Sequence, residues 1–317
     1  MAKKVQTVLG PIDPEQLGIT DMHDHLIRTG GQEVREDKDF LLNDVEKAVK
    51  EMEDYYACGG RSLVEAMPLG CGRDALKVLE VARRSKVNIV MITGFLKNRF
   101  YDVMHWLLHY SAEQVAGLLI KEITEGMDRY NYVGPIVERI PSRAGMLKAA
   151  TSYHCITPAE AKALHAVAIA HNETGAPILT HTEYGTMGME QIETFKKYGV
   201  DPARVTICHI DRNPDFDYHR MVADTGCFLV YDGPGRTKYY PDEVIINLIK
   251  RMVDAGYQKQ IMLGLDLGRA SYWKTNNGGP GFCYIIEKFV PRLKMAGISD
   301  AAIQDFLVNN PMRALAF

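Results

Sequence analysis

A pair of histidines two positions apart, His23 and His25, is the first feature of the sequence that could do chemistry. The pair ends the segment Thr20-Asp-Met-His-Asp-His25. On a β-strand alternate side chains share a face, so both imidazoles can point at one ion. Neutral imidazole is a common ligand of zinc and similar cations. A lone His-x-His pair is more often two polar residues at a strand end, so the prediction of a metal site depends on further ligands.

Three more candidate ligands, His181, His209 and Asp266, each end an apolar run later in the chain. A single histidine in such a place is more often a hydrogen-bonded core residue, but two on successive runs converge with the first pair on one volume. A carboxylate there is costly in an apolar interior unless it is paired or bound to a cation. For Asp266 the alternative is a salt bridge to Arg269. Together these residues predict a metal centre.

Lys148 is the only charged residue in the apolar run Ala144–Thr151. Burial lowers the pKa of a lysine toward that of the neutral amine, and nearby cations disfavour the ammonium further. A neutral amine can react with carbon dioxide to form a carbamate, whose two oxygens can bridge two metals. The alternatives are a lysine that points outward, or one that pairs with Glu65 or Asp266.

Eight apolar runs, separated by stretches with helix signals, must position these residues. Near-continuous apolar runs suit strands buried on both faces, as in a parallel sheet. Between the runs, Ser111–Gln114 and Thr157–Glu160 have the form of capping boxes, and Gly175 suits a helix end. The runs cover residues 17–23, 62–67, 88–94, 144–151, 176–181, 205–210, 227–233 and 261–266.

Alternating strands and helices predict an α/β protein, either a closed (β/α)₈ TIM barrel or an open doubly wound sheet. The strand count favours the barrel, with residues 1–317 as a single domain. An early run at Val5–Leu9 predicts an N-terminal β-hairpin across the barrel bottom. The candidate ligands other than Lys148, which lies inside its run, are at or near the ends of their runs, and a barrel of this kind builds its active site at the carboxyl ends of the strands.

Composition excludes several classes of protein. The chain has 317 residues, 46% of them hydrophobic, and a net charge of -3, with no long basic stripe that would bind nucleic acid or membrane lipid. No stretch approaches the roughly 18 apolar residues of a membrane span, and no secretory signal is recognisable at the start. The six cysteines form no Cys-x-x-Cys pair, which indicates free thiols in a cytoplasmic protein.

The motifs taken together resemble the phosphotriesterase family of the amidohydrolase superfamily over almost the whole chain. Six ligand positions in the family's order make the resemblance specific. The matching segments are Thr7-Val-Leu-Gly-Pro-Ile12, His23-Asp-His-Leu26, Arg143-Ala-Gly-Met-Leu-Lys148, Thr180-His-Thr182, His209-Ile-Asp-Arg212, Met262-Leu-Gly-Leu-Asp266 and Asn310-Pro-Met-Arg-Ala-Leu315.

The resemblance implies a binuclear, metal-dependent hydrolase and a homodimer. His23, His25 and Asp266 would hold the buried metal and His181 and His209 the exposed one, with a carboxylated Lys148 and a hydroxide between them. The hydroxide would attack, and Asp266 would carry its proton to the leaving group. Zinc is the expected metal, although manganese and cobalt accept the same ligands.

Two loops bear on the substrate: residues 231–240 and 268–281, which follow the last two predicted strands. They contain Arg236, Lys238, Arg269 and Lys274, and barrels often bind phosphate in these loops. An ordinary charged surface loop is the alternative. The loops are similar to those of a bacterial branch that opens phosphorylated sugar lactones and holds the phosphate with residues matching Lys238, Arg269 and Tyr272.

This similarity implies hydrolysis of a small-molecule phosphorylated lactone, a pentono-1,4-lactone 5-phosphate. Relatives that open acyl-homoserine lactones carry a tyrosine where this chain reads Gly94-Phe-Leu-Lys97, which weighs against long-acyl lactones. A phosphotriesterase or carboxylesterase acting on organophosphate or aryl esters is the alternative function.

Overall fold

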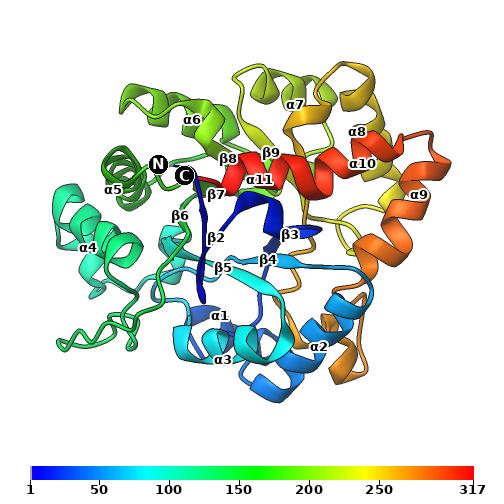
Figure 1. The fold of residues 1–317 in the computed structure, drawn as a ribbon. Coiled ribbons are helices and arrows are strands. Elements are labelled where there is room, and N and C mark those ends of the chain that lie inside the picture. Colours follow the sequence, from blue (N-terminus) through cyan, green and yellow to red (C-terminus); the bar gives the residue numbers. More distant parts are fainter. Residues whose placement is uncertain (1) are drawn as a thin grey trace.

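Eight parallel strands form the centre of the computed structural model, which describes residues 2–317 (Figure 1). Each strand overlaps one predicted apolar run, so the prediction of eight strands is confirmed. Their order is β10-β9-β8-β7-β6-β5-β4-β3. The strands are β3 (Thr20–Asp24), β4 (Ser62–Glu65), β5 (Asn88–Gly94), β6 (Met146–Thr151), β7 (Ile178–Thr182), β8 (Val205–Cys208), β9 (Phe228–Tyr231) and β10 (Ile261–Leu263).

The contact between the last and first strands turns this sheet into a barrel. The amides of Leu265 and Asp266, just after β10, donate to the carbonyl oxygen of His23 in β3 at 3.3 and 2.8 Å. Gly264 permits this approach, because a Cβ at that position would lie 3.1 Å from the backbone nitrogen of His23. The expected TIM barrel is therefore confirmed.

Helices alternate with the strands and surround them in Figure 1. The two predicted capping boxes begin α4 and α5, and Gly175 ends α5 in the left-handed conformation at φ 73°. No helix within residues 2–317 is both long and apolar enough to cross a membrane. The helices are α1 (Gln32–Glu36), α2 (Val45–Ala57), α3 (Ala75–Ser85), α4 (Ala112–Thr124), α5 (Pro158–Thr174), α6 (Gly188–Lys197), α7 (Phe216–Ala223), α8 (Asp242–Asp254), α9 (Val290–Met295), α10 (Asp300–Gln304) and α11 (Asn310–Leu315).

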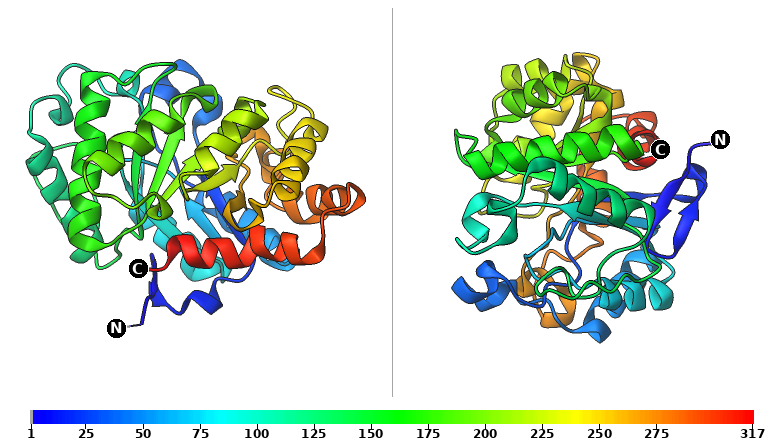
Figure 2. Two further views of the ribbon diagram at one scale, coloured as in Figure 1. Left: turned by 90° about the horizontal axis from the view of Figure 1, so that it is seen from above. Right: turned by 90° about the vertical axis from the view of Figure 1, so that its left-hand side faces the viewer.

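The apolar core has two layers, one between the helices and the strands and one inside the barrel. At the amino end of the strands, the inner layer is covered by the predicted hairpin of β1 (Val5–Thr7) and β2 (Gly10–Ile12) and by α11 (Figure 2). The amide of Val8 donates to Ile89 at the start of β5, and Lys4 and Phe317 exchange two backbone hydrogen bonds. The opposite, carboxyl end of the barrel is left for a site.

Glu65, at the end of β4, gives a prediction about stability. Its side chain is fully buried, one oxygen accepts the amide of Leu26, and burial raises its pKa to about 8. The folded protein therefore keeps a proton that the unfolded chain releases above about pH 4.3. The protonated carboxyl thus contributes to the free energy of unfolding, fully below about pH 4.3, and this contribution is lost as the pH rises to about 8.

We expect the free energy of unfolding of metal-free Glu65→Gln to fall less than that of the wild type between about pH 5 and 8. Urea unfolding at these two pH values measures the difference. Parallel pH profiles for the two proteins would show that Glu65 is not a proton-linked group.

Candidate metal centre and substrate pocket

The six predicted ligands line one cavity of about 540 Å³ at the carboxyl end of the barrel. They come from five strands of the barrel, with His23 and His25 from the same one and Lys148 from within its strand. Every one of the six was named from sequence, and the fold brings all of them together. They are His23 in β3, His25 just after it, Lys148 in β6, His181 in β7, His209 after β8 and Asp266 after β10.

The four imidazoles form a continuous row. The ring centroids of His25 and His23 are 5.6 Å apart, those of His23 and His209 are 4.7 Å apart, and those of His209 and His181 are 4.5 Å apart. Burial lowers the pKa of all four, to about 3 for His25 and His181. The rings are therefore neutral at physiological pH, which is the form that binds metal.

Asp266 lies beside this row and is held from two sides. Its Oδ1 is 3.2 Å from His25 Nε2, while its Oδ2 accepts hydrogen bonds from Arg212 and Arg236. Burial by itself would raise the pKa of Asp266, but Arg236, His25 and their neighbours keep it well below the usual range. The carboxylate is thus ionised and fixed in orientation.

The backbone is strained at two of the candidate ligands. His209 and Asp266 adopt left-handed conformations with φ of 62° and 52°, although neither is glycine. Such residues cost about 1–3 kcal/mol each and tend to occur where function requires a particular side-chain direction. Here both turns direct their side chains into the same cavity.

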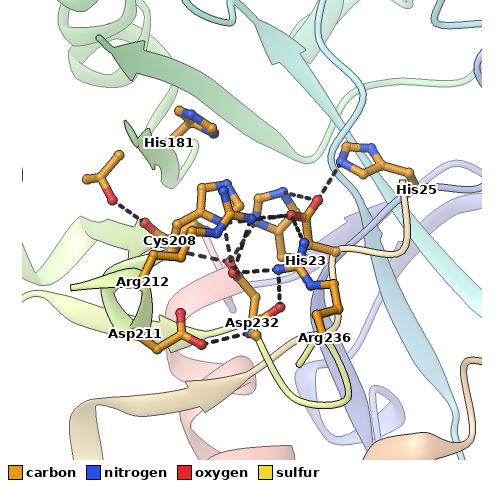
Figure 3. A network of polar contacts seen from close by, with 12 residues as sticks. His23, His25, His181, Cys208, Asp211, Arg212, Asp232 and Arg236 are labelled. Carbon is orange, nitrogen blue, oxygen red and sulfur yellow. Dashed lines mark hydrogen bonds and ion pairs between the residues drawn. The ribbon is translucent and has the colours of Figure 1, made fainter. Parts of the chain in front are cut away.

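Asp232, one residue after β9, is a member of the site that the sequence reasoning missed (Figure 3). Its Oδ1 accepts from His209 Nδ1 at 2.7 Å, and its Oδ2 accepts from the His209 amide at 3.0 Å and lies 3.3 Å from His23 Nδ1. The side chain is completely buried. One carboxylate therefore orients His209 by hydrogen bonds and lies against His23, and a charged residue near the end of the seventh apolar run was its signal in the sequence.

Replacing Asp232 with asparagine tests this orientation. The amide keeps the volume but offers an N–H group to one of two rings that need an acceptor, so we expect metal affinity to fall about 10- to 100-fold. Competition with a metal chelator measures the affinity, and circular dichroism checks that the fold is retained. A wild-type affinity in a folded variant would contradict this role.

Lys148 lines the cavity, with 1% of its surface exposed. No hydrogen bond joins its amine to any of residues 2–317, so the salt bridges to Glu65 or Asp266 considered from sequence are not formed. Burial lowers its pKa, which favours the neutral amine. The side chain therefore has the surroundings that carbamate formation requires.

The residues present fit a bound metal. His23, His25 and Asp266 offer ligand atoms within 4.8 Å of one another, as do His209, Asp232 and Asp266. The buried Nδ1 atoms of His23 and His25 have no aligned hydrogen-bond partner among residues 2–317. His181 lies outside these groups but next to His209. A set of neutral imidazoles and ionised carboxylates suits zinc and related divalent cations.

The three predicted phosphate contacts, Lys238, Arg269 and Tyr272, line the same cavity. Lys238 Nζ lies 5.6 Å from the ring centre of Tyr272. Lys274, the other lysine of these loops, instead lines a separate pocket with Glu51 and Asp54.

Arg269 does not pair with Asp266, so the alternative salt bridge considered from sequence is wrong. Its guanidinium instead contacts Asp37 at 2.5 Å and Asp39 at 3.3 Å, on the segment between α1 and α2. Asp39 also accepts from the amide and hydroxyl of Ser271. The arginine is therefore held at the edge of the cavity by carboxylates of another loop.

A metal-dependent hydrolase is the class of protein that this barrel and this site define, since barrel enzymes place their catalytic groups at the carboxyl end of the strands. The sequence model of the Phosphotriesterase family matches residues 3–315. The chain belongs to this family, whose enzymes are metal-dependent hydrolases.

Three relatives are similar to the chain over nearly its full length. The phospho-furanose lactonase of Mycoplasmopsis synoviae is 44% identical and covers 99% of this chain and 92% of its own. The structure of a lactonase from Listeria monocytogenes has a TM-score of 0.92 at 33% identity, covering 98% of both chains. The phosphotriesterase homology protein of Escherichia coli, complexed with phosphate in the active site, has a TM-score of 0.88 at 32% identity, covering 95% of this chain and 99% of its own.

Proposed function

We propose that the protein opens phosphorylated furanose lactones, with pentono-1,4-lactone 5-phosphate as the representative substrate. The observation that carries this proposal is that one cavity joins a metal-ligand set to the basic and phenolic side chains of Lys238, Arg269 and Tyr272. A relative 44% identical to the chain is named a phospho-furanose lactonase, which supports it. The reacting ester and the phosphate would thus be bound by two different parts of one pocket.

Two divalent cations would complete the site, with zinc expected and manganese or cobalt as alternatives. His23, His25 and Asp266 would hold one and His181 and His209 the other, with a carbamate on Lys148 shared by both. Bound in this way, the cations would polarise the lactone carbonyl and make a water nucleophile available at neutral pH.

Asp266 would move the proton. Its carboxylate is kept ionised by Arg212 and Arg236, so it can accept the proton that the attacking water loses. The same low pKa makes the resulting acid a ready donor to the ring oxygen when the bond between C1 and that oxygen breaks. The product is the open phospho-sugar acid.

Lys238, Arg269 and Tyr272 would bind the phosphate. Arginine can grip phosphate with two N–H groups and lysine acts as a point charge, while the tyrosine hydroxyl can donate a hydrogen bond. Arg269 already carries Asp37 as its partner. Phosphate would therefore have to compete with this carboxylate for the guanidinium.

Acid release by the metal-loaded protein, followed with a pH indicator, tests the function. The panel contains phosphorylated pentonolactones, the same lactones without phosphate, an acyl-homoserine lactone, a phosphotriester and an aryl ester. We expect the phosphorylated lactones to give the highest kcat/KM. No acid from any phosphorylated lactone would reject the proposal, and preferential turnover of the phosphotriester or aryl ester would favour the alternative function.

A further inference from the structure

An ion pair in the cavity wall, between Lys97 and Glu183, takes no part in the chemistry described above. Lys97 follows β5 and Glu183 follows β7, and their side chains are 7% and 20% exposed. Glu183 Oε2 accepts from the Lys97 ammonium and lies 3.0 Å from His181 Nε2. Removing two charges from water is costly unless their remaining hydrogen-bonding groups are also satisfied.

Several of these groups are open toward the cavity, which both side chains line. An ammonium has three N–H donors, and the hydrogen bond to Glu183 uses one of them. Glu183 Oε1 accepts no hydrogen bond from residues 2–317. The ring of Phe100, 5.3 Å from the ammonium, offers it only a weak contact. The wall therefore presents adjacent donors and an acceptor to a bound molecule.

A pair of neighbouring hydroxyl groups matches this arrangement. One hydroxyl can accept from the ammonium while the other donates to the free carboxylate oxygen. Hydrogen bonds to charged groups are stronger than those between neutral groups. A ligand without hydroxyl groups would instead leave the free N–H groups of Lys97 and the free oxygen of Glu183 without hydrogen-bond partners, which opposes its binding.

The order of the strands places this pair across the cavity from the predicted phosphate contacts. Counted around the barrel from β3, Lys97 and Glu183 follow the third and fifth strands, while Lys238 and Arg269 follow the seventh and eighth. The imidazole row lines the same cavity, running from His25 after the first strand through His23 and His209 to His181 in the fifth strand. A ligand anchored by phosphate at one wall would direct its far end to Lys97 and Glu183.

We propose that Lys97 and Glu183 bind the ring hydroxyl groups of the lactone, the C2 hydroxyl foremost, and so select hydroxylated over deoxygenated lactones. This rests on the lactonase function proposed above and adds the determinant of ring recognition. In a pentono-1,4-lactone 5-phosphate, the phosphate is on C5 and the reacting carbonyl is C1. C2 carries the hydroxyl farthest along the carbon chain from the phosphate, and C3 carries its neighbour.

The test compares substrates that differ only at C2. Ribono- and arabinono-1,4-lactone 5-phosphate are epimers at this carbon and share one 2-deoxy analogue. We expect the wild type to favour the better epimer over the 2-deoxy lactone by about 10- to 100-fold in kcat/KM. In Lys97→Met the ratio should fall toward one, because the donor is gone. An unchanged ratio in this variant would overturn the proposal.

Glu183→Gln should lower the same ratio, and its metal content must be measured because Glu183 also contacts His181. Lys250→Met is the matched control, since it removes the lysine of another ion pair, with Asp254, that lies outside the cavity. Its ratio should stay at the wild-type value. Equal losses on hydroxylated and deoxy substrates in Lys97→Met, together with a lower melting temperature, would mean a structural role and would also overturn the proposal.

Binding measurements separate this proposal from the lactonase function. If the wild type opens none of the lactones, the proposed function fails. Calorimetric binding of ribonic or arabinonic acid 5-phosphate and of the 2-deoxy acid phosphate to wild type and Lys97→Met then decides the hydroxyl contact. Weaker binding of the hydroxylated acids alone in the variant supports it, and parallel changes for both acids overturn it.

Discussion

Lys148→Ala is expected to lose about half of the bound metal and to fall by more than about 100-fold in kcat. Loss of a residue that only hydrogen-bonds to a metal ligand already costs up to about that factor, and Lys148 is proposed as a ligand itself. Lys148 lines the same cavity as the four imidazoles and is buried without a hydrogen-bond partner among residues 2–317, and a carbamate on it would be a ligand that the variant lacks. Elemental analysis of protein purified with excess zinc measures the metal, and lactone hydrolysis measures kcat.

Lys148→Met is the companion variant, because it fills the space of the side chain and cannot form a carbamate. Both variants should behave alike if the carbamate is what matters. Lys86→Ala, at the end of α3 and outside the cavity, serves as the control for loss of a lysine. Wild-type metal content in folded Lys148→Ala would show that a carbamate on Lys148 does not hold the metal.

Lys238→Met combined with Arg269→Met is expected to lower kcat/KM for phosphorylated lactones by about 10³-fold. Each substitution removes a hydrogen bond to a charged group, which should lower kcat/KM about 10- to 100-fold. The free-energy losses add when the sites are independent, so the two factors multiply. The same variant should open unphosphorylated lactones at the wild-type rate, because the metal ligands are untouched. Steady-state kinetics on both substrates give the comparison.

Lys274→Met is the matched control for the phosphate contacts. It lies on the same loop as Arg269, but its side chain lines a separate pocket with Glu51 and Asp54. Its kcat/KM for phosphorylated lactones should therefore be unchanged. A double variant that loses activity equally on phosphorylated and unphosphorylated lactones would show that these residues support the fold of the loop and do not bind phosphate.

The positions of the strands were predictable because a strand covered on both faces must be apolar along its length. The residues at which the strands end were harder to predict. The last run was predicted to continue to Asp266, but β10 ends at Leu263, and β8 ends at Cys208, one residue before His209. The left-handed conformations of Asp266 and His209 are incompatible with extended strand geometry. The left-handed turn at His209 thus explains why β8 ends where it does, whereas β10 already ends three residues before Asp266, and apolar periodicity reveals neither end.

The candidate ligands were predictable for the same reason: polar residues at the ends of apolar strands meet at one rim. Asp232 fits this rule and was overlooked, whereas other contacts depend on loops that approach only in the folded chain. Asp37 and Asp39 contact Arg269 although they are more than 200 positions away in the sequence, and Lys97 after β5 meets Glu183 after β7 across the end of the intervening strand β6. No local spacing encodes such pairs.

The closure of the barrel between its last and first strands also bears on how the protein unfolds. The amide of Asp266 donates a hydrogen bond to the carbonyl oxygen of His23, and both residues are candidate ligands. Any change that separates the first strand from the last must therefore also disperse the reactive groups. The hydrogen bonds that close the barrel therefore also hold two candidate ligands together, and opening the barrel at this point should abolish metal binding as well.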